Sequence, residues 1–120
     1  MKPDILRYKP DAEFFIDEQC YINELSNTDN DASLSIARAR VRPGVSTHWH
    51  RLRGTVERYV VLEGTGRVEV GELPAQDVGA NDVVIIPAGC RQRITNTGDV
   101  DLVFLALCSP RFEAGCYEES

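Results

Sequence analysis

The sequence lacks long apolar runs and an apolar leader. Its longest hydrophobic stretches, residues 82–90 and 101–108, are far too short to span a bilayer. The first residues, MKPDILRYKPDAEFF, contain no apolar core and no small-residue cleavage site, so no export signal is predicted. We therefore expect a cytoplasmic protein that has no membrane partner.

Paired cysteines and an excess of positive charge are also missing. The four cysteines, Cys20, Cys90, Cys108 and Cys116, show no CxxC spacing, and without an export signal they are expected to be reduced thiols. The 120 residues include 13 basic and 19 acidic side chains, which gives a net charge of -6. This balance argues against nucleic acid as a partner.

A helical period is missing as well, whereas strand signals recur about every ten residues. Short segments rich in β-branched residues are separated by turn signals such as RPG, GAND and NTGD. These segments are residues 20–26, 33–41, 57–64, 66–71, 82–87, 91–96 and 101–108. The pattern is typical of a β-sandwich or a small barrel, and the length fits one domain.

The expected organisation has three parts. An N-terminal arm covers residues 1–19, a β-barrel covers 20–110, and a C-terminal tail covers 111–120. The only candidate helix is a short turn in DAEFFI, residues 11–16, for which an irregular arm is the alternative. The tail is expected to pack Phe112 or Tyr117 outside the barrel.

Histidine is scarce, and both copies lie in the stretch THWHRLRGTVERYVVLEG. Strand alternation places His48 and His50 on one face and Trp49 on the other. The same rule places Glu57 and Tyr59 together on one face of the next strand. If these faces point inward, adjacent strands bring His48, His50 and Glu57 together; a polar strand surface is the alternative.

Two motifs around these residues resemble those of the cupin family. The first has the order Gly, His-x-His, Glu, Gly, and here it is supplied by Gly44, His48, His50, Glu57 and Gly64. The second is matched by GANDVVIIPAGCRQRITN, in which Gly79, Pro87, Gly89 and Asn96 are in register. The resemblance implies an all-β fold, the double-stranded β-helix (jelly roll) of a small single-domain cupin.

The resemblance also implies one divalent metal ion inside the barrel, held by His48, His50, Glu57 and Gln92. Gln92 stands where the family has its third metal histidine, and the segment between His50 and Glu57 is longer than usual. Two histidines and a carboxylate suit Fe(II), whereas a fourth amide ligand also admits Mn, Ni or Zn. Because an amide binds metal more weakly than imidazole does, a lost metal site is the alternative.

Glu57 and Tyr59 are the candidate catalytic residues, which would move a proton at the metal. Tyr59 is equally well explained as an aromatic residue of the pocket wall. Arg51 and Arg53, just after His50, could hold an anionic group of the ligand, with ordinary surface charge as the alternative. Cys90 is expected in the core, or as a soft metal ligand.

The implied function is that of a metal-binding cupin acting on a small molecule, by oxygenation, isomerisation or a lyase-type step. The alternative is a non-catalytic barrel that binds a small ligand and has a degenerate metal site, so enzyme activity is left open. A homodimer is expected, because EFFIDEQCYINEL carries apolar residues that one small barrel would not bury.

Overall fold

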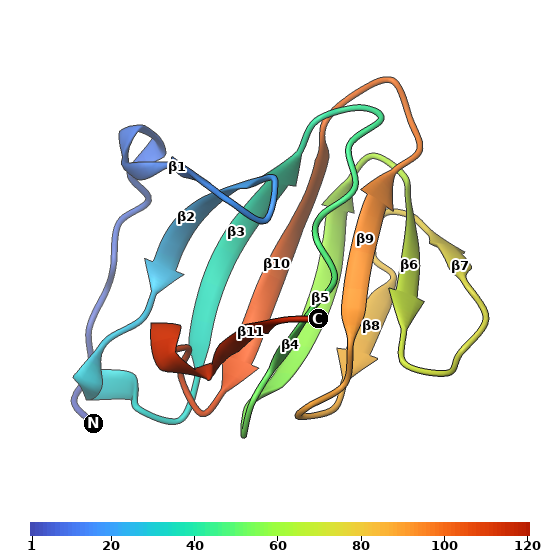
Figure 1. Cartoon of the computed structure of the whole chain (residues 1–120). Helices are drawn as coiled ribbons and strands as arrows, with labels where there is room; N and C mark the ends of the chain where they lie inside the picture. The colour runs from blue at the N-terminus through green and yellow to red at the C-terminus, as the bar shows by residue number, and fades with distance from the viewer.

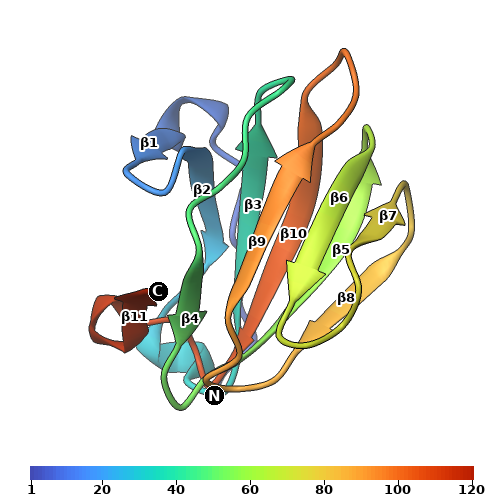
Figure 2. The ribbon, with the colours of Figure 1, turned by 45° about the vertical axis from the view of Figure 1, so that its right-hand side comes forward.

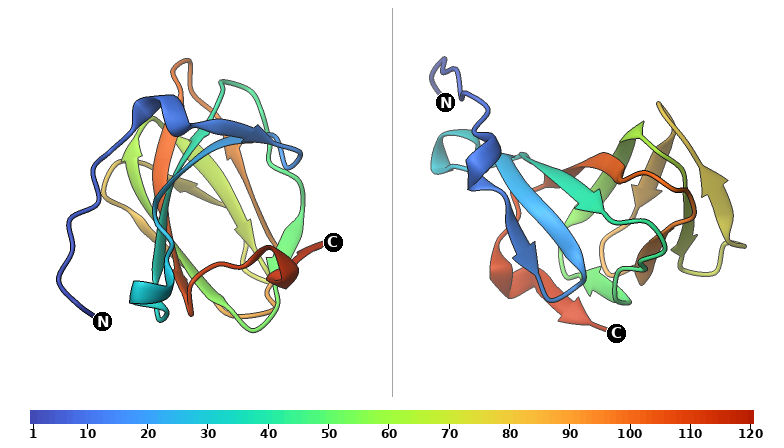
Figure 3. Two further views of the ribbon diagram at one scale, coloured as in Figure 1. Left: turned by 90° about the vertical axis from the view of Figure 1, so that its left-hand side faces the viewer. Right: turned by 90° about the horizontal axis from the view of Figure 1, so that it is seen from above.

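The computed structural model describes residues 1–120, which form two antiparallel sheets facing each other (Figures 1 and 3). The larger sheet has the order β1 (Phe14–Ile16), β2 (Cys20–Ser26), β3 (Ser35–Val41), β10 (Leu102–Ser109), β5 (Val56–Glu63) and β8 (Val83–Ile86). The smaller has the order β11 (Tyr117–Glu119), β4 (His50–Leu52), β9 (Gln92–Asn96), β6 (Gly66–Val70) and β7 (Gln76–Val78). This arrangement confirms the expected all-β jelly roll.

Helical structure is confined to three short 3-10 turns, η1 (Pro10–Ala12), η2 (Asp29–Asp31) and η3 (Ala114–Cys116). None of them has the length or apolar character needed to cross a membrane. The candidate helix over residues 11–16 therefore reduces to η1 followed by strand β1. The chain becomes extended at Glu13, and Phe14 then pairs with Ile22 of β2.

The apolar core fills the space between the two sheets, because alternate residues of the facing strands point inward. Val61 of β5, Ile86 of β8, Ile94 of β9 and Leu102 of β10 are at most 1% exposed. Each such side chain contributes roughly 1.5–3 kcal/mol when it is fully removed from water. Together they hold the half of the barrel that lies away from β1 and β11 in a tightly packed state.

The side chain of Asn96 links backbone segments at the packed half of the barrel by hydrogen bonds. Its Nδ2 donates to the carbonyl oxygens of Val41 at 2.9 Å and Val100 at 2.8 Å. Its Oδ1 accepts from the backbone N–H of Gly98 at 2.9 Å. Nearby, Gly64 has a φ of +82°, and a Cβ there would lie only 2.7 Å from a backbone oxygen. These residues of the two motifs therefore build the fold.

The opposite half of the barrel is framed by the two ends of the chain. β1 and β2 form a hairpin at the edge of the larger sheet, and β11 pairs with β4 at the edge of the smaller one (Figure 2). The tail therefore differs from the expectation, because Phe112 and Tyr117 both line the interior. The reason is the pairing of Tyr117 with Leu52, which fixes the tail against the barrel.

Candidate functional site

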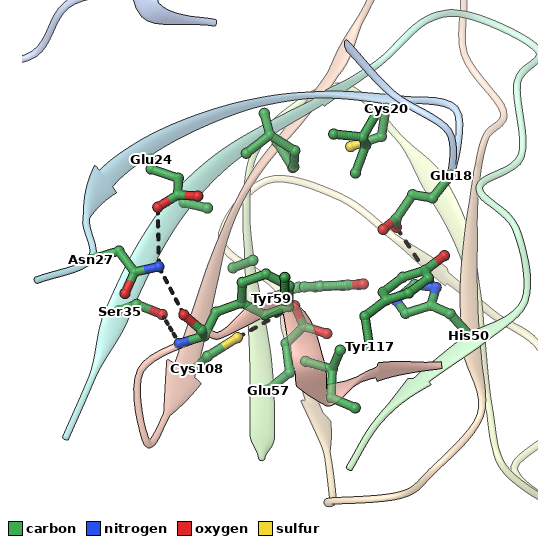
Figure 4. A pocket seen from close by; sticks show the side chains of 18 of the residues that line it. Glu18, Cys20, Glu24, Asn27, Ser35, His50, Glu57, Tyr59, Cys108 and Tyr117 are labelled. Carbon is green, nitrogen blue, oxygen red and sulfur yellow. Dashed lines mark hydrogen bonds and ion pairs between the residues drawn. The ribbon is translucent and has the colours of Figure 1, made fainter. Parts of the chain in front are cut away.

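A cavity of about 550 Å³ lies between the β1–β2 hairpin, the inner face of the larger sheet and the C-terminal tail (Figure 4). Of the 23 residues that line it, 15 are hydrophobic, so its wall is mainly apolar. The volume falls within the usual range for sites that hold small molecules. His50, Glu57 and Tyr59, three of the residues singled out in the sequence, line it.

A chain of hydrogen bonds joins Tyr59, Gln92 and Glu57 inside the barrel. The Tyr59 hydroxyl donates to Oε1 of Gln92, and Nε2 of Gln92 donates to Oε1 of Glu57 at 2.7 Å. Tyr59 is 3% exposed and Gln92 is fully buried. Because an ionised carboxylate only accepts, the amide nitrogen of Gln92 faces Glu57 and its oxygen is occupied by Tyr59.

His50 has one ring nitrogen bound to the protein and one that is free. Its Nδ1 lies 2.9 Å from the carbonyl oxygen of His48, which can only accept, so Nδ1 carries the proton. Nε2 has no protein partner, although His50 is only 3% exposed. No fully buried side-chain nitrogen or oxygen lacks a partner, so Nε2 must be reached from the cavity that His50 lines.

Two carboxyl groups flank this ring. Burial raises the pKa of Glu57 to about 7, although the hydrogen bond from Gln92 and the charge of His50 oppose the shift. Burial also raises the pKa of Glu18 to about 7, against the opposing charge of His48. Oε2 of Glu18 lies 3.7 Å from Nδ1 of His50 (Figure 4). Both carboxyl groups can therefore exchange a proton near neutral pH.

Two further side chains complete the surroundings of Glu57 and His50. The ring of Tyr117 stacks on His50 with centroids 5.2 Å apart, and partial burial raises its pKa to about 12. The Cys108 sulfur lies 3.8 Å from Oε2 of Glu57. Burial and the neighbouring Glu57 raise the pKa of the Cys108 thiol, so it stays protonated and is not an activated nucleophile.

The four residues predicted to bind metal are not all brought together. His50, Glu57 and Gln92 lie inside the barrel, but the His48 side chain is 46% exposed, with Nδ1 3.5 Å from a carboxylate oxygen of Glu119. His48 precedes β4, which begins only at His50, so strand alternation does not turn its ring inward. No three His, Cys, Asp or Glu side chains are placed to hold a metal ion.

The predicted anion-binding arginines lie outside the cavity. Arg51 and Arg53 are exposed, and both form ion pairs with Glu118 of β11. Nη2 of Arg53 also donates to the carbonyl oxygen of Gly115 at 2.8 Å. Arg51 and Arg53 therefore hold the C-terminal tail against β4.

The remaining residues singled out in the sequence are also outside the cavity. Trp49 packs outward, and the guanidinium groups of Arg91 and Arg93 lie 4.0 and 4.5 Å from the centre of its ring system. Cys90 is half-buried and packs against the core, as expected of a small core residue. Its sulfur would lie 2.8 Å from a Cβ added to Gly71.

Sequence reasoning missed Glu18 and Tyr117 as parts of the site. Glu18 lies in the turn between β1 and β2, and Tyr117 lies three residues from the C-terminus. Neither belongs to a motif or to a strand pattern that points inward. Only the folding of both chain ends over the barrel brings them to His50, so no local signal in the sequence could have identified them.

The fold of this chain is similar to that of several solved structures. The chain matches Pac13, a Streptomyces nucleoside dehydratase, at a TM-score of 0.78 and 16% identity, covering 98% of this chain and 92% of that one. It matches a predicted oxalate decarboxylase from Thermotoga maritima at a TM-score of 0.78 and 24% identity, covering 89% and 99%.

A third similar structure is the Cnp3 cupin domain of Schizosaccharomyces pombe. Its TM-score is 0.70 at 16% identity, and the match covers 77% of this chain and 65% of that chain. At such identities the likeness shows the fold alone. No curated protein matches the chain.

The family itself is shown by sequence. The profile described as "Cupin domain" matches residues 37–108, which is more than half of the chain. The matched region begins in β3 and ends in β10, so it contains both motifs as well as His50, Glu57 and Gln92. This chain is therefore a member of the cupin family.

Proposed function

We propose that the protein is a small-molecule enzyme of the lyase or isomerase type, in which His50 and Glu57 move a proton within the cavity. The observation that carries the proposal is the free Nε2 of the buried His50, which shares a cavity with the buried carboxyl group of Glu57. A base with a free lone pair and an acid that titrates near neutral pH are what such reactions require.

A dehydration illustrates how these groups would act. Nε2 of His50 would take a proton from a carbon next to a carbonyl group, and the electron pair of that C–H bond would form the new C=C bond. The protonated Glu57 would give its proton to the hydroxyl group on the adjacent carbon, which leaves as water. In an isomerisation the proton would instead return to a different atom of the substrate. Tyr59 and Gln92 would hold Glu57 in position.

The arrangement of the side chains does not fit the expected metal site. A metal would need His48 to leave Glu119 and turn inward, and Gln92 to release the Tyr59 hydroxyl from its only amide oxygen. We therefore assign no step to a metal ion. Pac13, which is similar to this chain in fold, is a dehydratase, and this supports the choice of reaction class.

Proton transfer can be tested before the substrate is known. The protein would be incubated in D₂O with a panel of small hydroxy-carbonyl compounds, with and without an amino group, and of nucleosides, including uridine, which was bound in structures of the Streptomyces protein. We expect at least one compound to gain deuterium or lose water, as read by mass spectrometry. Glu57→Gln should abolish the change, whereas Glu72→Gln, at an exposed position outside the cavity, should not.

The second candidate function is a non-catalytic barrel that binds a small ligand. The mainly apolar wall of the cavity favours it, because such a wall suits retention of a ligand as well as its conversion. In that case, a compound that binds would be recovered without deuterium and without loss of water. The same outcome with every bound compound would contradict the enzyme proposal.

A further inference from the structure

The lining of the cavity contains no lysine or arginine, although the chain has 13 of these residues. It does contain five carboxyl side chains: Asp17, Glu18, Glu24, Glu57 and Glu119. Glu57 is buried and Glu18 is half-buried, whereas the other three are exposed. The cavity therefore combines a mainly apolar wall with side chains that carry only one sign of fixed charge.

The carboxyl groups of the cavity also lack the arginine partners that several acidic groups have elsewhere in the molecule. Most of the arginines form ion pairs with acidic groups outside the cavity, as Arg40 does with Glu13 at 2.5 Å and Arg93 with Glu69 at 2.7 Å. None of the five lining carboxyl groups forms an ion pair with arginine or lysine; Glu18 and Glu119 have only histidine neighbours. A positive charge is thus missing from the cavity itself.

The wall of the cavity also contains several aromatic rings. Phe14, Tyr59, Phe104, Phe112 and Tyr117 all line the cavity. The rings of Tyr59 and Phe104 lie against each other at 4.4 Å, and Tyr117 covers His50 at the other side of Glu57 (Figure 4). The face of an aromatic ring attracts an organic cation, and the attraction grows when water is excluded.

A polar atom that faces the cavity and has no partner in the protein points to a ligand at this place. Nε2 of His50 is a hydrogen-bond acceptor inside the cavity, because Nδ1 already donates to the backbone. Oε2 of Glu57 has only the weak contact with the Cys108 thiol at 3.8 Å. Nε2 has no donor, and Oε2 of the ionised Glu57 has only this weak one, so a ligand that donates hydrogen bonds suits both atoms. An ammonium group donates hydrogen bonds and carries positive charge.

We infer that the ligand of this cavity is a small organic cation, in which an ammonium group is attached to an apolar or aromatic body. That it is also the substrate rests on the proposed function. The ammonium group would lie between Glu18 and Glu57 and the body would contact the aromatic wall. A carboxylate or phosphate ligand would lie beside Glu18 and Glu57 with no arginine or lysine to balance its charge, so the same lining disfavours anions.

Three probes of similar shape separate the effect of charge from that of size. Benzylamine, benzyl alcohol and benzoate would be titrated into the unmodified protein at neutral pH and followed by calorimetry. We expect benzylamine to bind about tenfold more tightly than benzyl alcohol, and benzoate to bind more weakly than either. Glu18→Gln should remove the preference for the amine, whereas Glu72→Gln should leave it unchanged.

The result that overturns the inference is benzoate binding as tightly as benzylamine, or no binding of benzylamine at all. A preference for the amine that persists in Glu18→Gln and Glu57→Gln also overturns it. Retained binding of benzyl alcohol shows that the cavity of a variant is intact. Deuterium uptake by a neutral or anionic substrate would contradict this inference alone, whereas amine binding without proton transfer would contradict only the enzyme proposal.

Discussion

Buried polar side chains occur at both ends of the barrel, and they differ in how completely their hydrogen bonds are used. At the packed end, Asn96 makes three hydrogen bonds to backbone groups through Nδ2 and Oδ1. At the cavity end, His50 and Glu57 are almost as deeply buried, yet Nε2 of His50 has no partner and Oε2 of Glu57 has only a weak one.

The difference separates polar residues that build the fold from those that are available to a ligand. A buried group whose bonds are all made stabilises one conformation, and nothing further can be gained by binding to it. A buried group with a free acceptor gains that bond only when a ligand arrives. The motif asparagine thus belongs to the first class and the motif histidine to the second, although both were identified by the same sequence pattern.

The largest effect is expected from Glu57→Gln, which removes the acid at the cavity end while it keeps the shape of the side chain. The amide keeps the size of the side chain and an oxygen that can accept from Gln92. It cannot transfer a proton, so the rate of the deuterium-exchange reaction should fall about 10²- to 10⁴-fold. The measurement is kcat/KM of the purified variant; a loss below threefold would show that Glu57 is not the acid.

The next effect is expected at the packed end, from Asn96→Ala. The change leaves the carbonyl oxygens of Val41 and Val100 and the N–H of Gly98 without their partner. The bond to Val41 is buried, whereas the other two are part-buried. An orphaned buried group costs about 1–3 kcal/mol and one that water reaches costs less, so the free energy of unfolding should fall by roughly 1–3 kcal/mol. Urea denaturation measures this loss, and kcat/KM per folded molecule should stay at the parent value.

The pH dependence of stability offers a third way to separate the two ends. The pKa of Glu57 rises from 4.5 to about 7 on folding, so the folded state binds its proton more tightly than the unfolded state does. That stabilisation is present below pH 4.5 and is lost as the pH rises through about 7.

The loss from Glu57 alone should amount to about 3 kcal/mol between those limits. Glu57→Gln should therefore flatten the fall in stability with rising pH, leaving the part that comes from Glu18. Thermal unfolding at a series of pH values measures the slope. An unchanged slope in the variant would mean that Glu57 does not titrate differently in the folded and unfolded states.

A smaller effect is expected from Tyr117→Ala, at the edge of the cavity. The ring lines the cavity and would contact the apolar or aromatic body of the ligand, and such aromatic contacts are worth about 0.5–1.5 kcal/mol. Ligand affinity should therefore fall about two- to tenfold, as measured by calorimetry with benzylamine. Tyr117→Phe keeps the ring and should restore the affinity, which separates stacking from any role of the hydroxyl group.

The sequence predicted the fold and the inner half of the site, and the reasons lie in particular residues. Alternation within β5 placed Glu57 and Tyr59 on the inner face, because that strand is long and regular. The same rule misplaced His48, because β4 begins only at His50. Glu18 and Tyr117 could not be predicted, since they reach His50 through contacts between the chain ends and the barrel.

The smallest effect on ligand binding is expected from Arg51→Ala combined with Arg53→Ala. These two arginines lie on the outside of the barrel, so the double variant serves as a comparison for changes in its interior. Both arginines are exposed and pair with Glu118, and exposed ion pairs contribute about 0–1 kcal/mol each. The double variant should lose less than about 2 kcal/mol of stability. Because neither side chain lines the cavity, the affinities for benzylamine and benzoate should both stay unchanged. A selective loss of benzoate binding would instead show that these arginines hold an anion, as the sequence alone suggested, and would reverse the charge assigned to the ligand.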